Sequence, residues 1–226
     1  MTKASVRPAA TSAEPPRACS FCPRLVAYRS RNHAANPDWF NGAVPSFGDA
    51  GARLLIVGLA PGLQGANRTG RPFTGDYAGL LLYQTLIKFG FARGTYDARS
   101  DDGVALTDAM ITNAVRCAPP ENKPTPGEID ACRTFLAGRI SSLPRLKAIV
   151  CLGRIAHDST LTALGMRRSA ATFAHAASHP AGPGLRIFDS YHCSRYNTNT
   201  GRLTEPMFET VFSAVRAHLD AAAPVG

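Results

Sequence analysis

The sequence predicts an α/β protein, a three-layer α/β/α sandwich around a central four-stranded, mainly parallel sheet. Two observations support this prediction. Four short apolar runs are continuous and rich in β-branched residues, which is typical of strands covered on both faces. Segments with helical periodicity lie between these runs, and such βαβα alternation indicates helices on both faces of a parallel sheet.

The strands are predicted at 53–58, 110–115, 147–153 and 185–191. A first helix follows Asp76 and ends before Gly90, because glycine is favoured just beyond a helix C-terminus. The stretch Thr125–Glu128 reads as a capping box and predicts the start of a second helix. A third helix is expected after Gly153 and a fourth from about Thr204. Ligands of such sheets bind at the carboxyl ends of the strands, so the loops after these strands are expected to carry the function.

The 226-residue chain is expected to form one domain over residues 18–222, after a disordered tail over residues 1–17 that is rich in Ala, Pro and Ser. No apolar run reaches the roughly 18 residues of a membrane span and no signal-peptide pattern is present, so a cytoplasmic protein is expected. Lys and Arg number 25 against 16 acidic residues, a net charge of +9. This excess favours a polyanionic partner such as nucleic acid, although many enzymes are basic without binding DNA.

Four of the six cysteines predict a metal site. Cys19 and Cys22 form a CxxC motif, and Cys117 and Cys132 enclose a proline-rich loop. Four thiolates suit either zinc or an iron–sulfur cluster. Zinc ribbons usually pair two short CxxC motifs, whereas only one pair is short here and Pro23 follows it, so a 4Fe–4S cluster is favoured. It is expected to be structural and to tie the N-terminal segment to the loop after the second strand.

The glycine-rich stretch "GLAPGLQGANRTGRPFTGD" at 58–76 joins the first strand to the first helix. Loops of this kind often hold phosphate groups. This one contains neither GxxxxGK[ST] nor GxGxxG, so a nucleotide-binding enzyme is disfavoured. No nucleotide cofactor is expected.

Two long motifs, "GLAPG…NRTGRPFTGD" and "HCSRYNTNTGRLT", stand together with the four cysteines. In this combination the chain resembles the uracil-DNA glycosylase superfamily, most closely its family 5 (B-type) iron–sulfur-containing branch, from Cys19 to the last helix. The resemblance implies a uracil-DNA glycosylase-like fold with a single glycosylase domain. It also implies an enzyme that flips a deaminated base out of DNA and hydrolyses its N-glycosidic bond, leaving an abasic site. Double-stranded and also single-stranded DNA are the implied partners, and the enzyme is expected to act as a monomer.

The resemblance assigns roles to residues in the loops. The stretch "GLAPG" has no polar side chain, so Asp76 is implied as the group that orients water or stabilises the sugar cation; the alternative is that Asp76 caps the following helix. His192 is implied to donate to uracil O2 as negative charge develops there. Phe73 is the expected stacking platform for the base. Either Asn113 or Asn122 is expected to read the base edge, and the sequence leaves that choice open.

Base choice and DNA contacts follow from neighbouring positions. Gly62 stands where stricter uracil enzymes carry a bulky Tyr, so relaxed specificity is expected, with uracil first and hypoxanthine or xanthine also accepted. The segment after His192 is expected to enter the minor groove, with Arg195 or Tyr196 wedged into the space left by the base. Further contacts to the DNA backbone or the pocket wall are expected from Asn197, Asn199 and Arg202.

One alternative comes from a different class: a non-enzymatic iron–sulfur protein that binds nucleic acid. It predicts that loss of His192 and Asp76 leaves the function unchanged. The enzyme hypothesis specifies a monofunctional glycosylase, because no lysine in the active-site loops is suited to Schiff-base chemistry.

Overall fold

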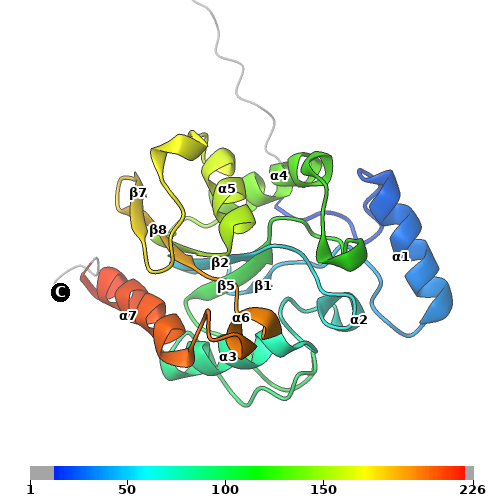
Figure 1. The fold of residues 1–226 in the computed structure, drawn as a ribbon, viewed down its shortest axis with the longest axis horizontal. Coiled ribbons are helices and arrows are strands. Elements are labelled where there is room, and N and C mark those ends of the chain that lie inside the picture. The colour runs from blue at the N-terminus through cyan, green and yellow to red at the C-terminus, as the bar shows by residue number, and fades with distance from the viewer. Residues whose placement is uncertain (1–12, 222–226) are drawn as a thin grey trace, which may run out of the picture.

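A six-stranded sheet forms the middle layer of the computed structural model, which describes residues 13–221 (Figure 1). Its strand order is β1-β5-β2-β6-β8-β7. The strands of the protein are β1 (Phe47–Gly48), β2 (Leu54–Gly58), β3 (Ala92–Arg93), β4 (Ala105–Leu106), β5 (Ala109–Asn113), β6 (Ala148–Leu152), β7 (Ser178–Gly182) and β8 (Leu185–Ser190). The four central strands are parallel and coincide with the four predicted runs. Two antiparallel edge strands escape prediction, because β1 has only two residues and β7 reads "SHPAG", without an apolar pattern.

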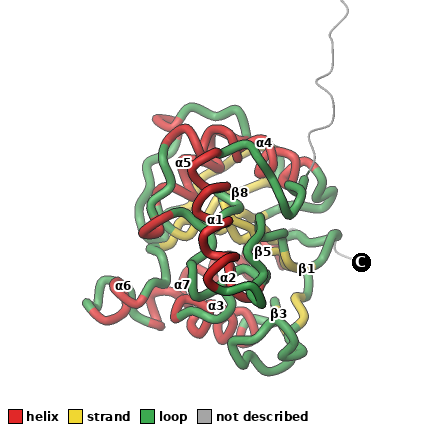
Figure 2. Tube along the Cα trace, turned by 90° about the vertical axis from the view of Figure 1, so that its right-hand side faces the viewer, coloured by secondary structure: helices red, strands yellow, loops and turns green. Residues whose placement is uncertain are grey.

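Helices cover both faces of the sheet, as predicted (Figure 2). They are α1 (Pro23–Ala35), α2 (Ala66–Thr69), α3 (Tyr77–Lys88), α4 (Pro126–Ser141), α5 (Arg154–Ala163), α6 (Arg195–Asn199) and α7 (Glu205–Ala221), with short 3-10 turns η1 (Pro120–Asn122) and η2 (Arg168–Ala170). Alternate residues of β2 point to opposite faces, so Leu54 and Ile56 pack with α3 and α7, whereas Leu55 and Val57 pack with α4 and α5. No helix in residues 13–221 is both long and apolar enough to cross a membrane.

The predicted helix ends are confirmed. The Thr125 hydroxyl accepts from the backbone N–H of Glu128 at 3.3 Å, and the Glu128 carboxylate accepts from the backbone N–H of Thr125 at 2.8 Å, a complete capping box. Gly90 follows the last turn of α3 at φ 71°, in the left-handed region that favours glycine. The capping box at Thr125 ends the loop that follows β5 at the carboxyl edge of the sheet.

The N-terminal segment departs from the predicted tail. Residues 1–12 lie outside the described residues, but residues 13–17, which the predicted tail includes, lie against the domain. Glu14 forms ion pairs with Arg116 and Arg139. Arg116 is only 1% exposed, so its charge requires a buried partner. Composition alone could not reveal this long-range pair.

Candidate functional site

A pocket of about 450 Å³ lies at the carboxyl ends of β2, β5 and β8, where ligands of parallel sheets bind. The loop from Leu59 to Ala66 forms one wall, and the start of α3 forms another. Seven residues predicted for the site line this pocket: Gly62, Phe73, Asp76, Asn113, Asn122, His192 and Arg195. The topology therefore brings together residues from three loops that are far apart in the sequence.

Phe73 lies at the back of the pocket with its ring nearly parallel to that of His192. The ring centroids are 5.9 Å apart and the planes are inclined by 28°. Phe73 has φ 52°, a left-handed conformation that costs a non-glycine residue about 1–2 kcal/mol. The two rings pack against each other, and the Phe73 ring gives the pocket an aromatic wall of the kind that suits a planar ligand.

Asn113 ends β5 and is 3% exposed. Its Oδ1 atom is buried and has no hydrogen-bond partner among the described residues. A Cβ on Gly58 would stand 2.4 Å from this oxygen and 2.6 Å from Cζ of Phe73. Gly58 therefore allows the amide and the ring to meet at the end of β2. An unpaired buried acceptor is costly, so a donor from a ligand would be stabilised here.

Asp76 stands at the N-cap position of α3, but its side chain makes no capping hydrogen bond. Oδ1 is buried and unpaired among the described residues. Oδ2 points at the backbone of the loop from Leu59 to Ala66. A Cβ on Gly62 would be 3.0 Å from this oxygen, and a Cβ on Gly65 only 2.3 Å. Burial raises the pKa of the Asp76 carboxyl, and the nearby backbone N–H groups of Gly79 and Ala78 partly oppose that rise. The carboxylate therefore lines the pocket while the N–H groups at the start of α3 still act on it, so the structure is compatible with both the catalytic and the capping role.

His192 lies two residues beyond the end of β8 and has no charged partner among the described residues. Burial lowers the pKa of its imidazole to about 4, so the ring is neutral at pH 7. The backbone carbonyl of His192 accepts a hydrogen bond from Nδ2 of Asn197 at 2.8 Å. Asn197 does not line the pocket; its amide instead ties the His192 backbone to the next turn.

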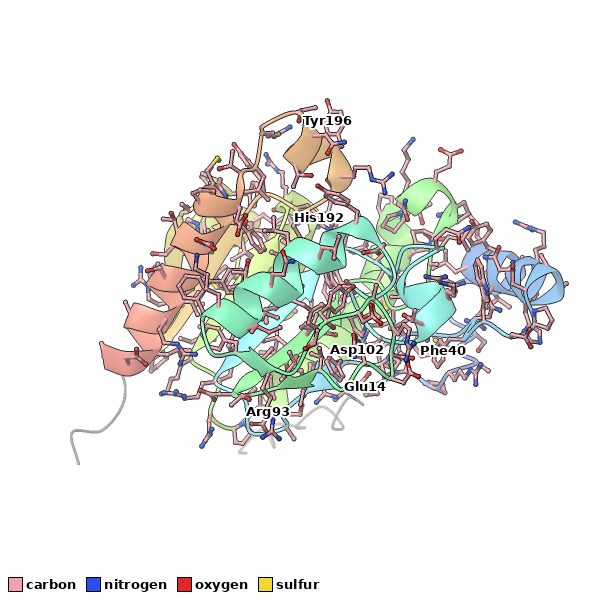
Figure 3. All side chains as sticks on the ribbon, turned by 90° about the horizontal axis from the view of Figure 1, so that it is seen from below. Glu14, Phe40, Arg93, Asp102, His192 and Tyr196 are labelled. Carbon is pink, nitrogen blue, oxygen red and sulfur yellow. The ribbon has the colours of Figure 1, made fainter. Side chains whose placement is uncertain are left out.

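The outer segment around α6 carries the remaining predicted DNA contacts. Tyr196 is 70% exposed and points away from the body of the molecule (Figure 3). The Arg195 guanidinium lies 5.3 Å from the Tyr77 ring at the pocket mouth. Arg202 lies over the ring of Tyr191 at 4.8 Å. Asn199 is exposed at the end of α6. None of Tyr196, Asn199 and Arg202 lines the pocket.

The four predicted cysteines line a second pocket, between α1, the loop after β5 and α4. Cys19, Cys117 and Cys132 are each no more than 9% exposed. Nη1 of Arg29 lies 3.5 Å from Sγ of Cys117, and the backbone N–H of Arg116 donates to Sγ of Cys132 at 3.3 Å. Hydrogen-bond donors around sulfur are typical of thiolates that ligate iron–sulfur clusters, so these residues fit such a group.

The remaining cysteines belong to the core. Cys151 and Cys193 are both fully buried; Sγ of Cys151 lies 3.4 Å from the Thr160 hydroxyl, and Sγ of Cys193 lies 3.5 Å from the Ala78 carbonyl. Both side chains are therefore packed in the core.

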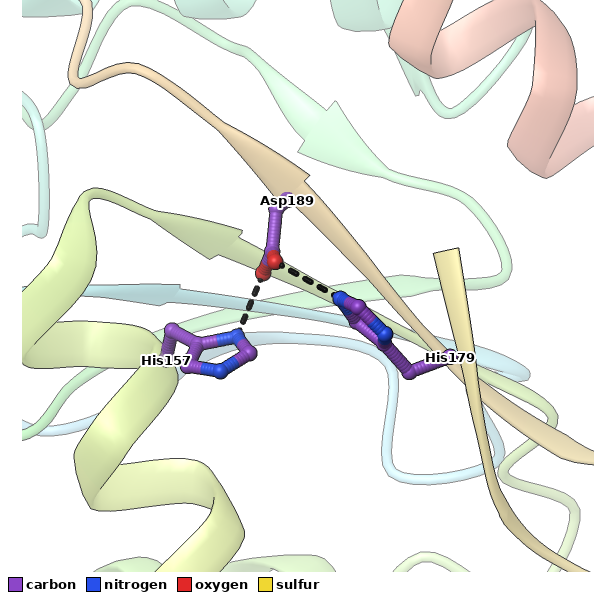
Figure 4. Close-up of side chains that lie close together, drawn as sticks. All are labelled: His157, His179 and Asp189. Atoms are coloured by element: carbon purple, nitrogen blue, oxygen red, sulfur yellow. Dashed lines mark hydrogen bonds and ion pairs between the residues drawn. The ribbon is translucent and has the colours of Figure 1, made fainter. Parts of the chain in front are cut away.

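A polar group lies behind the pocket, on the side of β8 that faces α5 (Figure 4). Asp189 is fully buried and holds His157 Nδ1 at 2.7 Å and His179 Nε2 at 3.1 Å. The ligand atoms of these three residues lie within 4.8 Å of one another, close enough to hold a metal ion. However, each carboxylate oxygen already has an imidazole partner, and Nε2 of His157 contacts the Ala171 carbonyl at 3.1 Å. Hydrogen bonds therefore account for the arrangement.

Sequence reasoning missed several pocket residues. The most consequential is Gly65, which leaves space for the Asp76 carboxylate. Tyr77 and Ser194 also line the pocket. Gly65 lies inside the loop that the sequence indicates as functional, but only the three-dimensional approach of Asp76 reveals its role. Arg116 lies on the loop near the four cysteines, but its side chain is buried and forms an ion pair with Glu14. Its charge is therefore not available to a ligand at the surface.

The chain is similar to known proteins over most of its length. Residues 45–216 match the family model described as "Uracil DNA glycosylase superfamily". The chain is 46% identical over 206 residues to the Type-5 uracil-DNA glycosylase of Thermus thermophilus, covering 88% of this chain and 93% of that protein. It is 42% identical over 191 residues to the Type-5 uracil-DNA glycosylase of Pyrobaculum aerophilum, covering 82% of each. A Type-4 uracil-DNA glycosylase of the same organism is 36% identical over 150 residues, covering 66% of this chain and 62% of that protein.

Proposed function

The chain belongs to the uracil DNA glycosylase superfamily, and on that basis we propose that it is a monofunctional uracil-DNA glycosylase. It takes a deaminated base out of the DNA stack and hydrolyses its N-glycosidic bond, leaving an abasic site. One observation carries the proposal: two buried, unpaired acceptors, Oδ1 of Asp76 and Oδ1 of Asn113, line the same pocket as an aromatic ring and a neutral imidazole.

Base recognition is assigned to Phe73 and Asn113. The Phe73 ring stacks on the flipped base, an interaction worth about 1–3 kcal/mol per base in comparable settings. Oδ1 of Asn113 accepts from the uracil N3–H, and its amide group donates to O4. Asn113 is preferred to Asn122 because its acceptor is buried and unpaired, whereas Asn122 is exposed in η1 and positioned to meet DNA at the rim.

Bond cleavage is assigned to His192 and Asp76. The C1′–N1 bond breaks with its electron pair leaving on the base, and the neutral imidazole donates an N–H to O2 as negative charge develops. The Asp76 carboxylate stabilises the cationic sugar and orients the water that adds to C1′. No lysine is among the described residues that line the pocket, which supports hydrolysis without a Schiff-base step.

Substrate range follows from Gly62. With no side chain there, the pocket keeps space beside the base, and we assign relaxed specificity, with uracil first and hypoxanthine and xanthine also accepted. A side chain at this position would also press on the Asp76 carboxylate, since a Cβ would lie 3.0 Å from Oδ2. Gly62 thus serves both the base and the catalytic group.

The four-cysteine pocket is assigned to a structural 4Fe–4S cluster held by Cys19, Cys22, Cys117 and Cys132. Hydrogen-bond donors lie at two of these sulfurs, Nη1 of Arg29 at Cys117 and the backbone N–H of Arg116 at Cys132, and such donors are typical of thiolates that hold iron–sulfur clusters. When bound, the cluster supplies a cross-link between the CxxC segment, the loop after β5 and α4.

The DNA partner is assigned to the pocket mouth and α6. Arg195 lines the mouth and Tyr196 projects beyond it, so both are placed to enter the space that the flipped base leaves. Asn199 and Arg202 lie on the same segment and are assigned to backbone contacts. Double-stranded DNA is the main substrate, and the enzyme acts as a monomer.

The test is a base-excision assay on the purified protein. Duplexes containing a single uracil, hypoxanthine, xanthine or thymine are incubated with it and then treated with alkali. Alkali-labile sites are expected with uracil and, more slowly, with the two purines. Absence of such sites with the uracil duplex, despite binding of that duplex, would favour the non-enzymatic alternative.

A further inference from the structure

Phe73 is held by a buried network that has no atom in the pocket. The Tyr96 hydroxyl donates to the Phe73 carbonyl at 3.0 Å, and the Tyr83 hydroxyl donates to the Pro72 carbonyl at 2.8 Å. Nε of Arg71 donates to the Thr74 hydroxyl at 2.7 Å. Each residue from 72 to 74 therefore accepts a hydrogen bond from a side chain that does not line the pocket.

The network is anchored by the ion pair between Arg71 and Asp102. Nη1 and Nη2 of Arg71 donate to the two carboxylate oxygens at 2.8 and 2.7 Å, and the side chains are only 5% and 1% exposed. The Asp102 carboxylate also accepts from the backbone N–H groups of Asp97 and Val104, each at 3.1 Å. Asp102 thus joins the 97–104 loop to the 71–74 turn; Figure 3 shows it well away from His192.

Aromatic rings surround the guanidinium. The centre of the Arg71 guanidinium lies 5.2 Å from the Phe47 ring, 5.3 Å from Tyr83 and 5.9 Å from Tyr96. Tyr83 and Tyr96 stack on each other at 4.5 Å. A buried charge that is fully paired and enclosed in this way is difficult to rearrange, because breaking one contact leaves a desolvated charge.

The backbone of Phe73 needs such a restraint. Its φ of 52° is unfavourable for a side-chain-bearing residue, so an unrestrained turn would relax and rotate the ring. Gly79 shows how close the fit is: a Cβ there would lie 2.0 Å from the Phe73 carbonyl oxygen and 2.2 Å from the Tyr96 hydroxyl oxygen. The α3 backbone and the Tyr96 hydroxyl therefore enclose the Phe73 carbonyl. This contact restrains the backbone that carries the Phe73 ring.

We propose that Arg71, Asp102 and Tyr96 are positioning residues that hold Phe73 in its strained conformation, so that its ring is ready to stack on the flipped base. The inference rests on the proposed function, since it specifies how that pocket recognises its base. It assigns a recognition role to residues that touch neither the base nor the reacting atoms.

The test compares Asp102→Asn and Tyr96→Phe with a matched control, Asp108→Asn. Asp108 also pairs with an arginine, Arg53, with Nε to Oδ2 at 2.7 Å, but at the opposite edge of the sheet. Steady-state constants are measured on a uracil-containing duplex well below each variant's unfolding temperature. We expect KM to rise about 10-fold in Asp102→Asn and about 3-fold in Tyr96→Phe, with kcat nearly unchanged, because stacking stabilises bound substrate and transition state alike. The control should keep the wild-type KM.

A double-mutant cycle separates positioning from simple loss of stability. In the Phe73→Ala background, Asp102→Asn should cause no further rise in KM, because the ring that it positions is gone. Effects of the two substitutions that multiply, or an unchanged KM in both Asp102→Asn and Tyr96→Phe, would overturn the inference. Tyr96→Phe removes a single hydroxyl and keeps the test available if Asp102→Asn does not fold.

A measurement that needs no catalysis distinguishes this inference from the proposed function. Amide hydrogen exchange over residues 73–75 should be faster in Asp102→Asn and Tyr96→Phe than in the wild type and Asp108→Asn. Unchanged exchange there would contradict the restraint. If the wild-type protein excises no base, the proposed function fails, while the exchange result still reports whether the network restrains Phe73.

Discussion

The carboxylate of Asp76 lies against the backbone of Gly65, so close that a Cβ on Gly65 would stand 2.3 Å from Oδ2 and 2.8 Å from Cγ of Asp76. Gly62 leaves a second gap on the same side of the carboxylate. The glycines of the first loop thus form a niche for an acid supplied by the far end of that loop. This relationship explains how a loop whose "GLAPG" stretch has no polar side chain still presents a carboxylate to the pocket.

The niche predicts the effect of adding one methyl group. Gly65→Ala should displace the Asp76 carboxylate and lower kcat for uracil excision about 100-fold, because misplacing a catalytic group by about 1 Å has effects of that size. The matched control is Gly127→Ala, since a Cβ on Gly127 meets nothing within 4 Å. Steady-state kinetics would check this, and equal rates for the two variants would refute the niche.

The pH dependence of excision should lack the inflection of an ordinary histidine. Burial lowers the pKa of His192 to about 4, so its neutral form persists through the physiological range. Burial raises the pKa of Asp76 above its ordinary 3.8, so its ionised form is lost on the acid side. The rate should therefore show no inflection from His192 near neutral pH, and it should fall on the acid side as Asp76 takes up a proton. A rate profile with an inflection near 6.5 that disappears in His192→Gln would contradict the neutral imidazole.

Stability should depend on pH through His157. Burial alone would lower the pKa of His157, but the hydrogen bond and charge of Asp189, with smaller contributions from the Ala171 carbonyl and the charge of Asp158, raise it above its ordinary 6.5. Since the folded-state pKa is the higher one, the stabilisation is full below pH 6.5 and is lost as pH rises through the folded pKa.

Urea unfolding of the wild type and His157→Gln at several pH values measures this contribution. The difference in free energy of unfolding should be largest at low pH and shrink as pH rises. The His179 and Phe173 rings, 5.6 and 5.7 Å from the His157 ring, are unchanged in the variant. If the difference in free energy of unfolding between the wild type and His157→Gln instead grows toward alkaline pH, His157 is buried in its neutral form.

The cysteine pocket predicts metal content. The aerobically or anaerobically purified protein should contain about four iron atoms per chain and no zinc. Cys132→Ser should lose most of the iron and lower the unfolding temperature, because a cross-link between α4 and the CxxC segment is removed. Cys151→Ser is the control, since Cys151 is also buried but lies in β6 and does not line the cysteine pocket. Loss of iron in Cys151→Ser but not in Cys132→Ser would exclude the assigned ligands.

Much of the fold could be predicted from the sequence, because the central strands and main helices have strong local signals. The apolar run at β6 and the capping box at Thr125 are readable without tertiary information. Strand β7 was not readable because "SHPAG" has no apolar pattern, although its partner β8 follows it directly in the chain. The contact between Glu14 and Arg116 was not readable because the two residues are 102 positions apart. The pocket residues could be named from motifs, but the unpaired state of Asp76 could not. Its spacing also fitted a helix cap, and only the geometry shows that one buried carboxylate oxygen has no hydrogen-bond partner among the described residues.

The central claim is that this pocket hydrolyses the N-glycosidic bond of uracil with Asp76 as its carboxylate. The most direct test is the single-turnover rate constant for uracil release from a U·G duplex, measured for the wild type and for Asp76→Ala with the folding of both verified by circular dichroism. The account predicts clear release by the wild type and a loss of about 100-fold or more in the variant. A variant that releases uracil at close to the wild-type rate would contradict it.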